Sequence, residues 1–246
     1  MKTYLLICVN YKSYEFLQVF LESVARAAEK VKGRLKVDIE VANNSENNLG
    51  YLGGALPIYS KRAKGYDYVS ISNVDLQLTN DFFEKLLCIQ ESNIGWIAPD
   101  IYTDKINRHE NPYLLKRPDK HNFFIWNIIY SSTFLYRLYR YLYILKSQKT
   151  KIYPQCTIYA GHGSFMLFTK EFIDSYPKLQ FPGFMYGEEI FFAELVRRAQ
   201  KKVLYAPTLK IENIGNISTG LLNQKQKSKW SKESLNNIYK QFFVKK

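Results

Sequence analysis

The sequence contains few of the residues that build disulfide frameworks or zinc sites. Among 246 residues there are three cysteines and three histidines. The number of cysteines is odd, and they lie far apart, at Cys8, Cys88 and Cys156, with no Cys-x-x-Cys pattern. This spacing argues against a disulfide scaffold or a zinc site and fits a reducing compartment. We therefore expect a cytoplasmic protein.

Long apolar runs are also missing. No stretch reaches the roughly 20 apolar residues that a membrane-spanning helix needs. The run Tyr4–Val9 near the N-terminus is short, and Asn10-Tyr11-Lys12 ends it without a small-residue cleavage site. We expect neither a membrane span nor a secretory signal.

Acidic residues are scarce relative to basic ones. The chain has 22 Asp and Glu against 35 Lys and Arg, a net charge of +13. Such a surplus favours an anionic partner: nucleic acid, an acidic membrane surface or a phosphorylated small molecule. Apolar residues make up 46% of the chain and aromatic residues 16%, which predicts a packed core rather than disorder.

The first hundred residues alternate between strand and helix patterns. Apolar runs predict strands at 4–9, 37–42, 66–72 and 94–98, the last ended by Pro99, with helices between them. The last third repeats the alternation, with strands expected at 164–168, 203–206 and 209–212 and a helix at 188–200. The pattern predicts an α/β fold with a mostly parallel sheet and helices on both faces.

The middle of the chain, residues 102–156, breaks this alternation. It contains the stretch Phe123–Lys151, which is rich in aromatic and basic residues. Three interpretations are open. The stretch forms an amphipathic helix at an anionic membrane surface, or a helix packed on the protein's own core, or a surface that stacks on single-stranded nucleic acid.

Polar residues follow three of the predicted strands. They are Asn10, Asn43-Asn44 and Asn73-Val74-Asp75. In open parallel sheets ligands bind at the carboxyl ends of the strands, so these residues form a candidate site. Asp75 is suited to hold a hard divalent cation beside a phosphate. The alternative is that Asp75 is an ordinary turn residue.

Three further segments have both a chemical and a purely structural interpretation. The glycine-rich segment 48–54 lets backbone N–H groups approach a phosphate or a sugar, or is a simple turn; it has neither GK[ST] nor GxGxxG. Gly161-His162-Gly163-Ser164 presents a histidine to a ligand, or is a turn with an incidental histidine. Tyr186-Gly187-Glu188-Glu189 supplies a general base, or only places carboxylates where the helix dipole favours them.

The order of these segments along the chain is more specific than any one of them. It resembles the family 2 glycosyltransferases of GT-A fold, in particular bacterial enzymes that build capsule, O-antigen and related polysaccharides. The resemblance covers Tyr4–Asp100 and Tyr159–Thr219 well and Tyr102–Cys156 poorly. It implies a GT-A (Rossmann-like) mostly parallel sheet flanked by helices, with a helical aromatic and basic insertion.

The resemblance implies a role for each segment. Asp75 would bind Mg²⁺ or Mn²⁺ on the donor diphosphate, and Glu189, beside Glu188, would be the catalytic base. The other implied contacts fall into two sets. Residues at the donor nucleotide-sugar are Asn10, Asn43, Asn48, Gly50, Gly53, Gly54 and Asn73, and residues at the acceptor are Gly161, His162, Gly163 and Tyr186.

The implied function is inverting transfer of a hexosyl or deoxyhexosyl group. The donor is a nucleotide-diphosphate sugar, and the acceptor is a hydroxyl of a glycan or a lipid-linked glycan. One GT-A domain would comprise a donor-binding half (1–100), the insertion (101–158), an acceptor and catalytic half (159–222) and a basic C-terminal tail (223–246). The protein would be cytoplasmic, with Phe123–Lys151 in peripheral contact with the inner face of an anionic membrane.

Two other functions stay open at this stage. One is a nucleic-acid-binding protein, which the net charge favours, although the basic residues are spread along the chain and no nucleic acid is expected as a partner of the enzyme. The other is a GT-A-like protein that binds sugar without catalysis. It is favoured by Asn43, where the family usually has Asp, and by the lack of the family's histidine near Glu212-Asn213 and Ser218-Thr219. Glu189 also replaces an Asp, which keeps the carboxylate but lengthens its reach.

Overall fold

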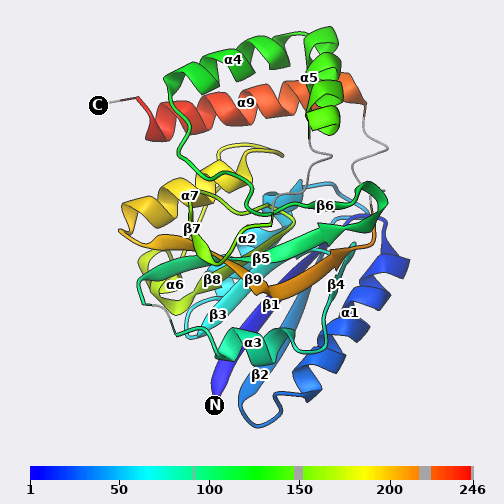
Figure 1. Ribbon diagram of the computed structural model, residues 1–246, viewed down its shortest axis with the longest axis vertical. Helices are drawn as coiled ribbons and strands as arrows, with labels where there is room; N and C mark the ends of the chain where they lie inside the picture. The colour runs from blue at the N-terminus through cyan, green and yellow to red at the C-terminus, as the bar shows by residue number, and fades with distance from the viewer. Residues whose placement is uncertain (91, 147–151, 216–222, 245–246) are drawn as a thin grey trace.

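The structure is a computed structural model that describes residues 1–90, 92–146, 152–215 and 223–244. Within them the chain forms a nine-stranded sheet with the order β2-β1-β3-β8-β5-β9-β4; β6 pairs with β5 and β7 with β9 (Figure 1). Five strands run in one direction: β1 (Lys2–Asn10), β2 (Leu35–Asn43), β3 (Tyr68–Asn73), β5 (Ile94–Thr103) and β9 (Lys202–Asn213). The opposite direction is taken by β4 (Leu76–Leu78), β6 (Arg108–His109), β7 (Cys156–Ile158) and β8 (Phe165–Thr169).

Helices cover both faces of the sheet, as the alternating pattern predicts. One core cluster joins the sheet to α2 (Tyr51–Arg62), α6 (Lys170–Ser175) and α7 (Glu188–Arg198). The other joins it to α1 (Tyr14–Glu29) and α3 (Phe82–Leu87). The strands β1 and β3 are buried on both sides, which explains why their sequences are continuous apolar runs.

Two details of the sheet differ from the sequence-based prediction. The prediction that Pro99 ends a strand is wrong, because β5 continues to Thr103. The two short strands expected at 203–206 and 209–212 are one strand, β9. The pairing of β5 with β9 shifts register between Pro99 and Asp100, where Pro99 pairs with Ala206 and Asp100 with Lys210. The irregularity accommodates a proline that cannot donate a ladder hydrogen bond.

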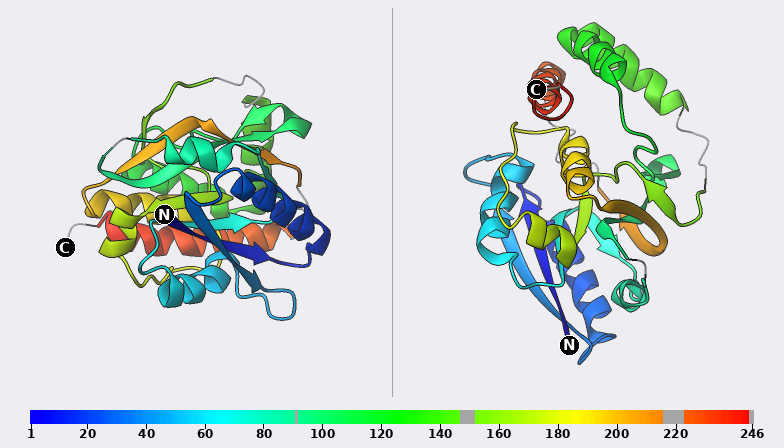
Figure 2. Two further views of the ribbon diagram at one scale, coloured as in Figure 1. Left: turned by 90° about the horizontal axis from the view of Figure 1, so that it is seen from below. Right: turned by 90° about the vertical axis from the view of Figure 1, so that its left-hand side faces the viewer.

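The predicted insertion and the C-terminal segment form a helical layer at one end of the molecule. α4 (Lys120–Ser131) packs along α9 (Gln224–Phe242), and α5 (Thr133–Lys146) contacts both of these helices. Figures 1 and 2 show the three helices together at one end of the molecule. Ser228 donates a hydrogen bond to the carbonyl of Tyr130, and Asn127 to Asn236. The C-terminal segment is therefore a packed helix. Residues 147–151 of the aromatic and basic stretch and Ser218-Thr219 lie outside the described residues.

A short 3-10 turn, η1 (Asp104–Ile106), links β5 to β6. No helix in the described part of the chain is long and apolar enough to cross a membrane.

Candidate active site

The polar ends of β1, β2 and β3 lie side by side. Asn10 pairs with Asn43 across β1 and β2, and Asn73 pairs with Val9 across β1 and β3. Asn10 is fully buried, and its amide donates to Asn43 Oδ1 at 3.4 Å. Asn43 is exposed, and its side chain is hydrogen-bonded, donating to the Tyr14 hydroxyl at 3.1 Å and accepting from the Ser45 hydroxyl at 2.7 Å. The strand ends therefore meet as the sequence predicts.

Asp75 follows β3 at the same edge. Its carboxylate lies against Gly215, where a Cβ would come within 2.6 Å of Asp75 Oδ2. Burial raises the pKa of this carboxyl, and no ion pair to it is found among the described residues. A desolvated carboxylate without a basic partner is poised to accept a cation.

The glycine-rich segment positions the start of α2. Gly50 has φ +76°, and a Cβ there would lie 2.2 Å from the carbonyl oxygen of Phe184, so only glycine fits. Asn48 Oδ1 accepts a hydrogen bond from the Gly50 N–H at 3.0 Å. The buried amide of Asn44 donates to the Gly50 carbonyl at 2.8 Å and fills the space where Gly54 lacks a Cβ.

The other glycine of this segment has a different environment. The nearest atom to a Cβ at Gly53 would be at an ordinary 3.4 Å, so no close approach requires glycine there. Asn44, by contrast, belongs to the strand-end residues that the sequence predicts as a candidate site, although the resemblance assigned it no contact of its own. The Asn-Asn pair was visible in the sequence, but which amide points inward is a property of the fold.

Backbone conformation presents the paired carboxylates. Tyr186 and Gly187 both have left-handed φ values, +69° and +89°, and this turn brings the chain into α7. A Cβ on Gly187 would lie 2.9 Å from Ile238 Cδ1 of α9, so the C-terminal helix closes over the turn. Glu188 and Glu189 form the first turn of α7, where the helix dipole favours negative charge.

Gly163 holds the second of these carboxylates. Its N–H donates to Glu189 Oε1 at 3.3 Å, and a Cβ on Gly163 would lie 2.8 Å from that oxygen. Burial raises the pKa of both Glu188 and Glu189, and for Glu189 the charge of Glu188 raises it further. Both carboxyls therefore bind a proton more readily than exposed ones, as a general base near neutral pH requires.

The residues around Gly163 serve the packing of this segment. A Cβ on Gly161 would lie 2.6 Å from Ala98 Cβ, so Gly161 permits close contact with β5. His162 Nδ1 lies 2.8 Å from Ser164 Oγ, and its ring meets Tyr113 edge to face. Burial lowers the pKa of His162, which keeps it neutral.

Tyr51, the first residue of α2, links the two halves of the site. After burial, the charges of Glu188, Glu189 and Asp75 are the next largest causes that raise the pKa of its hydroxyl. The backbone makes the same connection, because the Asn73 N–H donates to the Ser164 carbonyl at 2.8 Å, next to Gly163. The end of β3 that leads to Asp75 therefore lies beside the segment whose Gly163 binds Glu189.

A metal site built entirely by protein is absent from the described part of the chain. No group of three or more His, Cys, Asp or Glu side chains is placed to hold an ion there. Asp75 offers a single oxygen ligand, which suits Mg²⁺ or Mn²⁺ when a bound diphosphate and water complete the shell. The residues therefore fit an ion that arrives with a phosphorylated ligand.

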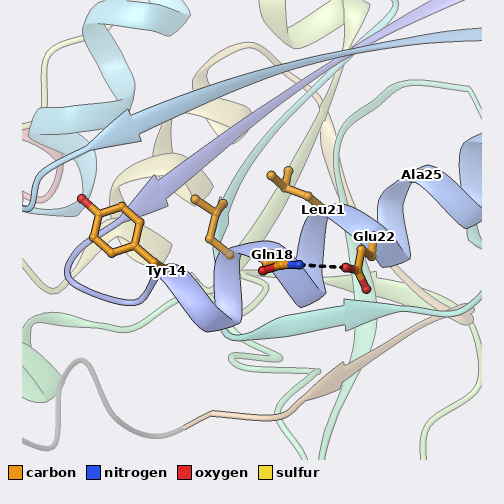
Figure 3. Close-up of a pocket in the computed structure, with 6 residues that line it drawn as sticks. Tyr14, Gln18, Leu21, Glu22 and Ala25 are labelled. Carbon is orange, nitrogen blue, oxygen red and sulfur yellow. Dashed lines mark hydrogen bonds between the residues drawn. The ribbon is translucent and has the colours of Figure 1, made fainter.

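A separate cavity of about 420 Å³ lies beside α1 (Figure 3). It is lined by Tyr14, Leu17, Gln18, Leu21, Glu22 and Ala25, none of which is a predicted site residue. The Tyr14 hydroxyl accepts a hydrogen bond from the Asn43 amide at 3.1 Å, so the cavity adjoins the exposed end of the strand edge.

Solved structures with a similar fold are known, although no protein-family model and no curated protein matches the sequence. One is the catalytic domain of Drosophila β1,4-galactosyltransferase 7 in complex with xylobiose. It aligns with a TM-score of 0.54 and 15% identity over 96% of this chain and 84% of that chain. A mutant of the same enzyme with manganese, UDP-Gal and xylobiose aligns with a TM-score of 0.54 and 14% identity, over 93% and 79% of the two chains.

A third neighbour is GalNAc-T7 with UDP, GalNAc and Mn²⁺. It aligns with a TM-score of 0.52 and 14% identity over 96% of this chain and 47% of that chain. These proteins have the GT-A fold. The comparison confirms the fold class predicted from the sequence; at such low identity it establishes the fold alone.

Proposed function

We propose that this protein is a metal-assisted, inverting glycosyltransferase. One observation carries the proposal: the Asn73 N–H, at the carboxyl end of β3 just before Asp75, donates to the Ser164 carbonyl, and the neighbouring Gly163 N–H donates to Glu189. Ligands bind at this edge in α/β sheets. The structural neighbours hold UDP ligands and manganese, which supports a nucleotide-diphosphate sugar donor and a divalent ion here.

Glu189 is the proposed base. It takes the proton from the acceptor hydroxyl as that oxygen attacks the anomeric carbon and the bond to the diphosphate breaks. Its raised proton affinity suits this role, and the Gly163 N–H fixes one carboxylate oxygen, which orients the group before the substrate arrives. Glu188 keeps Glu189 basic through its charge.

Asp75 would hold Mg²⁺ or Mn²⁺ at the donor diphosphate. The ion would neutralise negative charge that develops on the departing diphosphate. Asn10, Asn43 and Asn73 border the donor, and the buried Asn44 keeps the start of α2 in place beside it. His162, neutral and 2.8 Å from Ser164 Oγ, would contact the acceptor together with Tyr186.

The order of the motifs favours a family 2 enzyme of the bacterial type that builds capsule, O-antigen or a related polysaccharide. The transferred group is then a hexosyl or deoxyhexosyl unit, and the acceptor is a glycan or a lipid-linked glycan. One neighbour holds xylobiose, which supports a saccharide acceptor. In this proposal residues 1–100 bind the donor, 101–158 form the insertion, 159–222 bind the acceptor and supply the base, and 223–246 form the C-terminal segment.

We also propose peripheral contact with an anionic membrane through α4 and α5. Phe123 and Tyr136 are buried, so the helices do pack on the protein. The outward side nevertheless exposes Phe124 by 67% and Phe134 by 72%, with Ile125, Ile128, Leu138 and Leu142 also exposed. Lys116, Lys120 and Arg137 in the same part of the chain are exposed as well. Apolar groups accompanied by basic ones suit an acidic lipid surface.

The test of the enzymatic proposal is a thermal-shift screen of nucleotide-sugars with and without Mn²⁺, followed by a transfer assay. A ligand that binds only the folded protein raises the melting temperature. We expect one nucleotide-sugar to do so in a Mn²⁺-dependent manner, and Asp75→Asn to abolish the dependence. Asp174→Asn, an exposed carboxylate on α6, is the matched control and should behave as wild type.

Two outcomes would contradict the proposal. One is that no nucleotide-sugar binds with Mn²⁺ present, especially if the protein instead binds nucleic acid with steep salt dependence. The other is that Asp75→Asn binds and transfers as well as wild type.

A further inference from the structure

The hydroxyl of Tyr51 is a buried polar atom that no described residue of the chain satisfies. In the described part of the chain it has no hydrogen-bond partner, although its oxygen is shielded from solvent. Buried polar atoms are nearly always paired, since an unpaired one costs the full desolvation of the group. An exception beside a candidate active site therefore indicates a partner that arrives with a ligand.

The fold holds this hydroxyl in place. Tyr51 is the first residue of α2 and follows Gly50, which has a positive φ. The Gly50 carbonyl accepts a hydrogen bond from the side-chain amide of Asn44. The Tyr51 ring packs against the hydrophobic core. Because backbone and ring are both fixed, the oxygen cannot turn to water or to another internal acceptor.

The surroundings define the chemistry of the missing partner. The charged groups that act on the hydroxyl are the carboxylates of Asp75, Glu188 and Glu189, none within hydrogen-bond distance. Burial, and then these carboxylates, raise the pKa of the Tyr51 hydroxyl, so the phenol keeps its proton and acts as a donor. The partner must therefore present an acceptor oxygen to the hydroxyl of Tyr51, at the start of α2.

We propose that the Tyr51 hydroxyl donates a hydrogen bond to an oxygen of the sugar diphosphate of the donor, and so is a further substrate-binding residue of this site. The assignment rests on the proposed function, because a nucleotide-diphosphate sugar is the ligand that would bridge these carboxylates. It adds a contact that neither motif spacing nor the family resemblance assigned.

The experiment compares Tyr51→Phe with wild type. The probe is whichever of UDP-galactose, UDP-N-acetylglucosamine, GDP-mannose and dTDP-rhamnose raises the melting temperature of the wild type with Mn²⁺; its Kd is then measured by calorimetry. A hydrogen bond to a charged oxygen predicts roughly 10- to 100-fold weaker binding by the variant. The melting temperature without ligand should be unchanged or higher, because an unsatisfied buried group has been removed.

Tyr59→Phe is the matched control on the same helix. The Tyr59 hydroxyl is satisfied, since it donates to the Tyr176 carbonyl at 3.0 Å. Its loss should lower the melting temperature and leave donor affinity unchanged. Tyr51→Phe should therefore weaken donor binding without lowering the melting temperature, whereas Tyr59→Phe should lower the melting temperature without weakening donor binding.

The outcomes separate the two proposals. If the wild type binds no member of the panel, the proposed function fails and the Tyr51 assignment fails with it. If the wild type binds but Tyr51→Phe binds equally well, only the Tyr51 assignment is overturned. A clear fall in the ligand-free melting temperature of Tyr51→Phe would also overturn it, because the hydroxyl would then have an internal partner.

Discussion

Replacing Glu189 by glutamine separates the catalytic and the structural consequences of a buried carboxylate. Glutamine has nearly the same shape, and its Oε1 can still accept the Gly163 N–H. It cannot take a proton from an acceptor hydroxyl. Loss of a general base costs about 10²- to 10⁴-fold in rate. We therefore expect kcat to fall by that factor while nucleotide-sugar binding is retained.

Stability should change in the opposite direction. Burial and the charge of Glu188 raise the pKa of Glu189 above its value in the unfolded chain. Below the unfolded pKa the carboxyl is protonated in both states and contributes nothing. As the pH rises, the unfolded chain releases the proton first, so folding loses stability until the pH passes the folded pKa. Glutamine removes this loss.

The size of the effect follows from the proton affinity. Each tenfold difference in the proton affinity of Glu189 between the folded and unfolded states corresponds to about 1.4 kcal/mol of folding free energy. In a chain of this length that is roughly 3–6 °C in melting temperature. Glu189→Gln should therefore melt higher than wild type at pH 8, with the difference shrinking towards pH 5.

The assay is a melting curve at several pH values beside a transfer assay on the same preparations. A variant that keeps wild-type kcat would refute the assignment of the base. If the difference in melting temperature between the variant and wild type were the same at every pH, the conclusion that burial raises the pKa of Glu189 would be refuted.

Two other predictions concern regions outside the base. Burial opposes ionisation of Glu194 in α7, but hydrogen bonds from Arg117 and Arg197 outweigh it and lower its pKa. Glu194→Gln should therefore destabilise the protein at pH 7 by about 2–3 kcal/mol, a moderate value because the two arginines are partly exposed. The loss of stability should fade as the pH falls through the pKa of Glu194 in the folded protein. Equal urea midpoints of variant and wild type at pH 7 would contradict this prediction. Phe124→Ser with Phe134→Ser should reduce flotation with anionic vesicles without lowering the melting temperature, because both rings are mostly exposed; unchanged flotation would show that α4 and α5 only pack on the protein.

Much of the sheet was accessible from the sequence because its signals are local. The apolar runs of β1 and β3 mark strands buried on both faces, and the polar residues that end them fall into register in the structure. The resemblance added the pairing of Asp75 with Glu189, which residue patterns alone could not connect. These two residues are more than one hundred positions apart, and only the folded chain joins their segments, through the hydrogen bond from Asn73 to the Ser164 carbonyl and that from Gly163 to Glu189.

Other features depend on pairing partners that no local pattern specifies. The insertion of β8 between β3 and β5 in the opposite direction is one example. The continuity of β5 through Pro99 is another, because the tolerance comes from a register shift against β9. Local rules predict that a strand ends at a proline, because proline cannot donate a ladder hydrogen bond. The register shift against β9 lets β5 continue past Pro99.

The amino-acid sequence by itself determined the alternation of strands and helices, the polar strand ends and the presence of carboxylates suited to acid–base work. Tertiary structure decided which of those groups lose water. Burial raised the proton affinity of Glu189. The fold also set the buried amide of Asn44 against the start of α2, and it left the Tyr51 hydroxyl without a partner among the described residues. Desolvation is the physical reason for the division, because it depends on every neighbour that packs around a side chain and not on the order of residues along the chain.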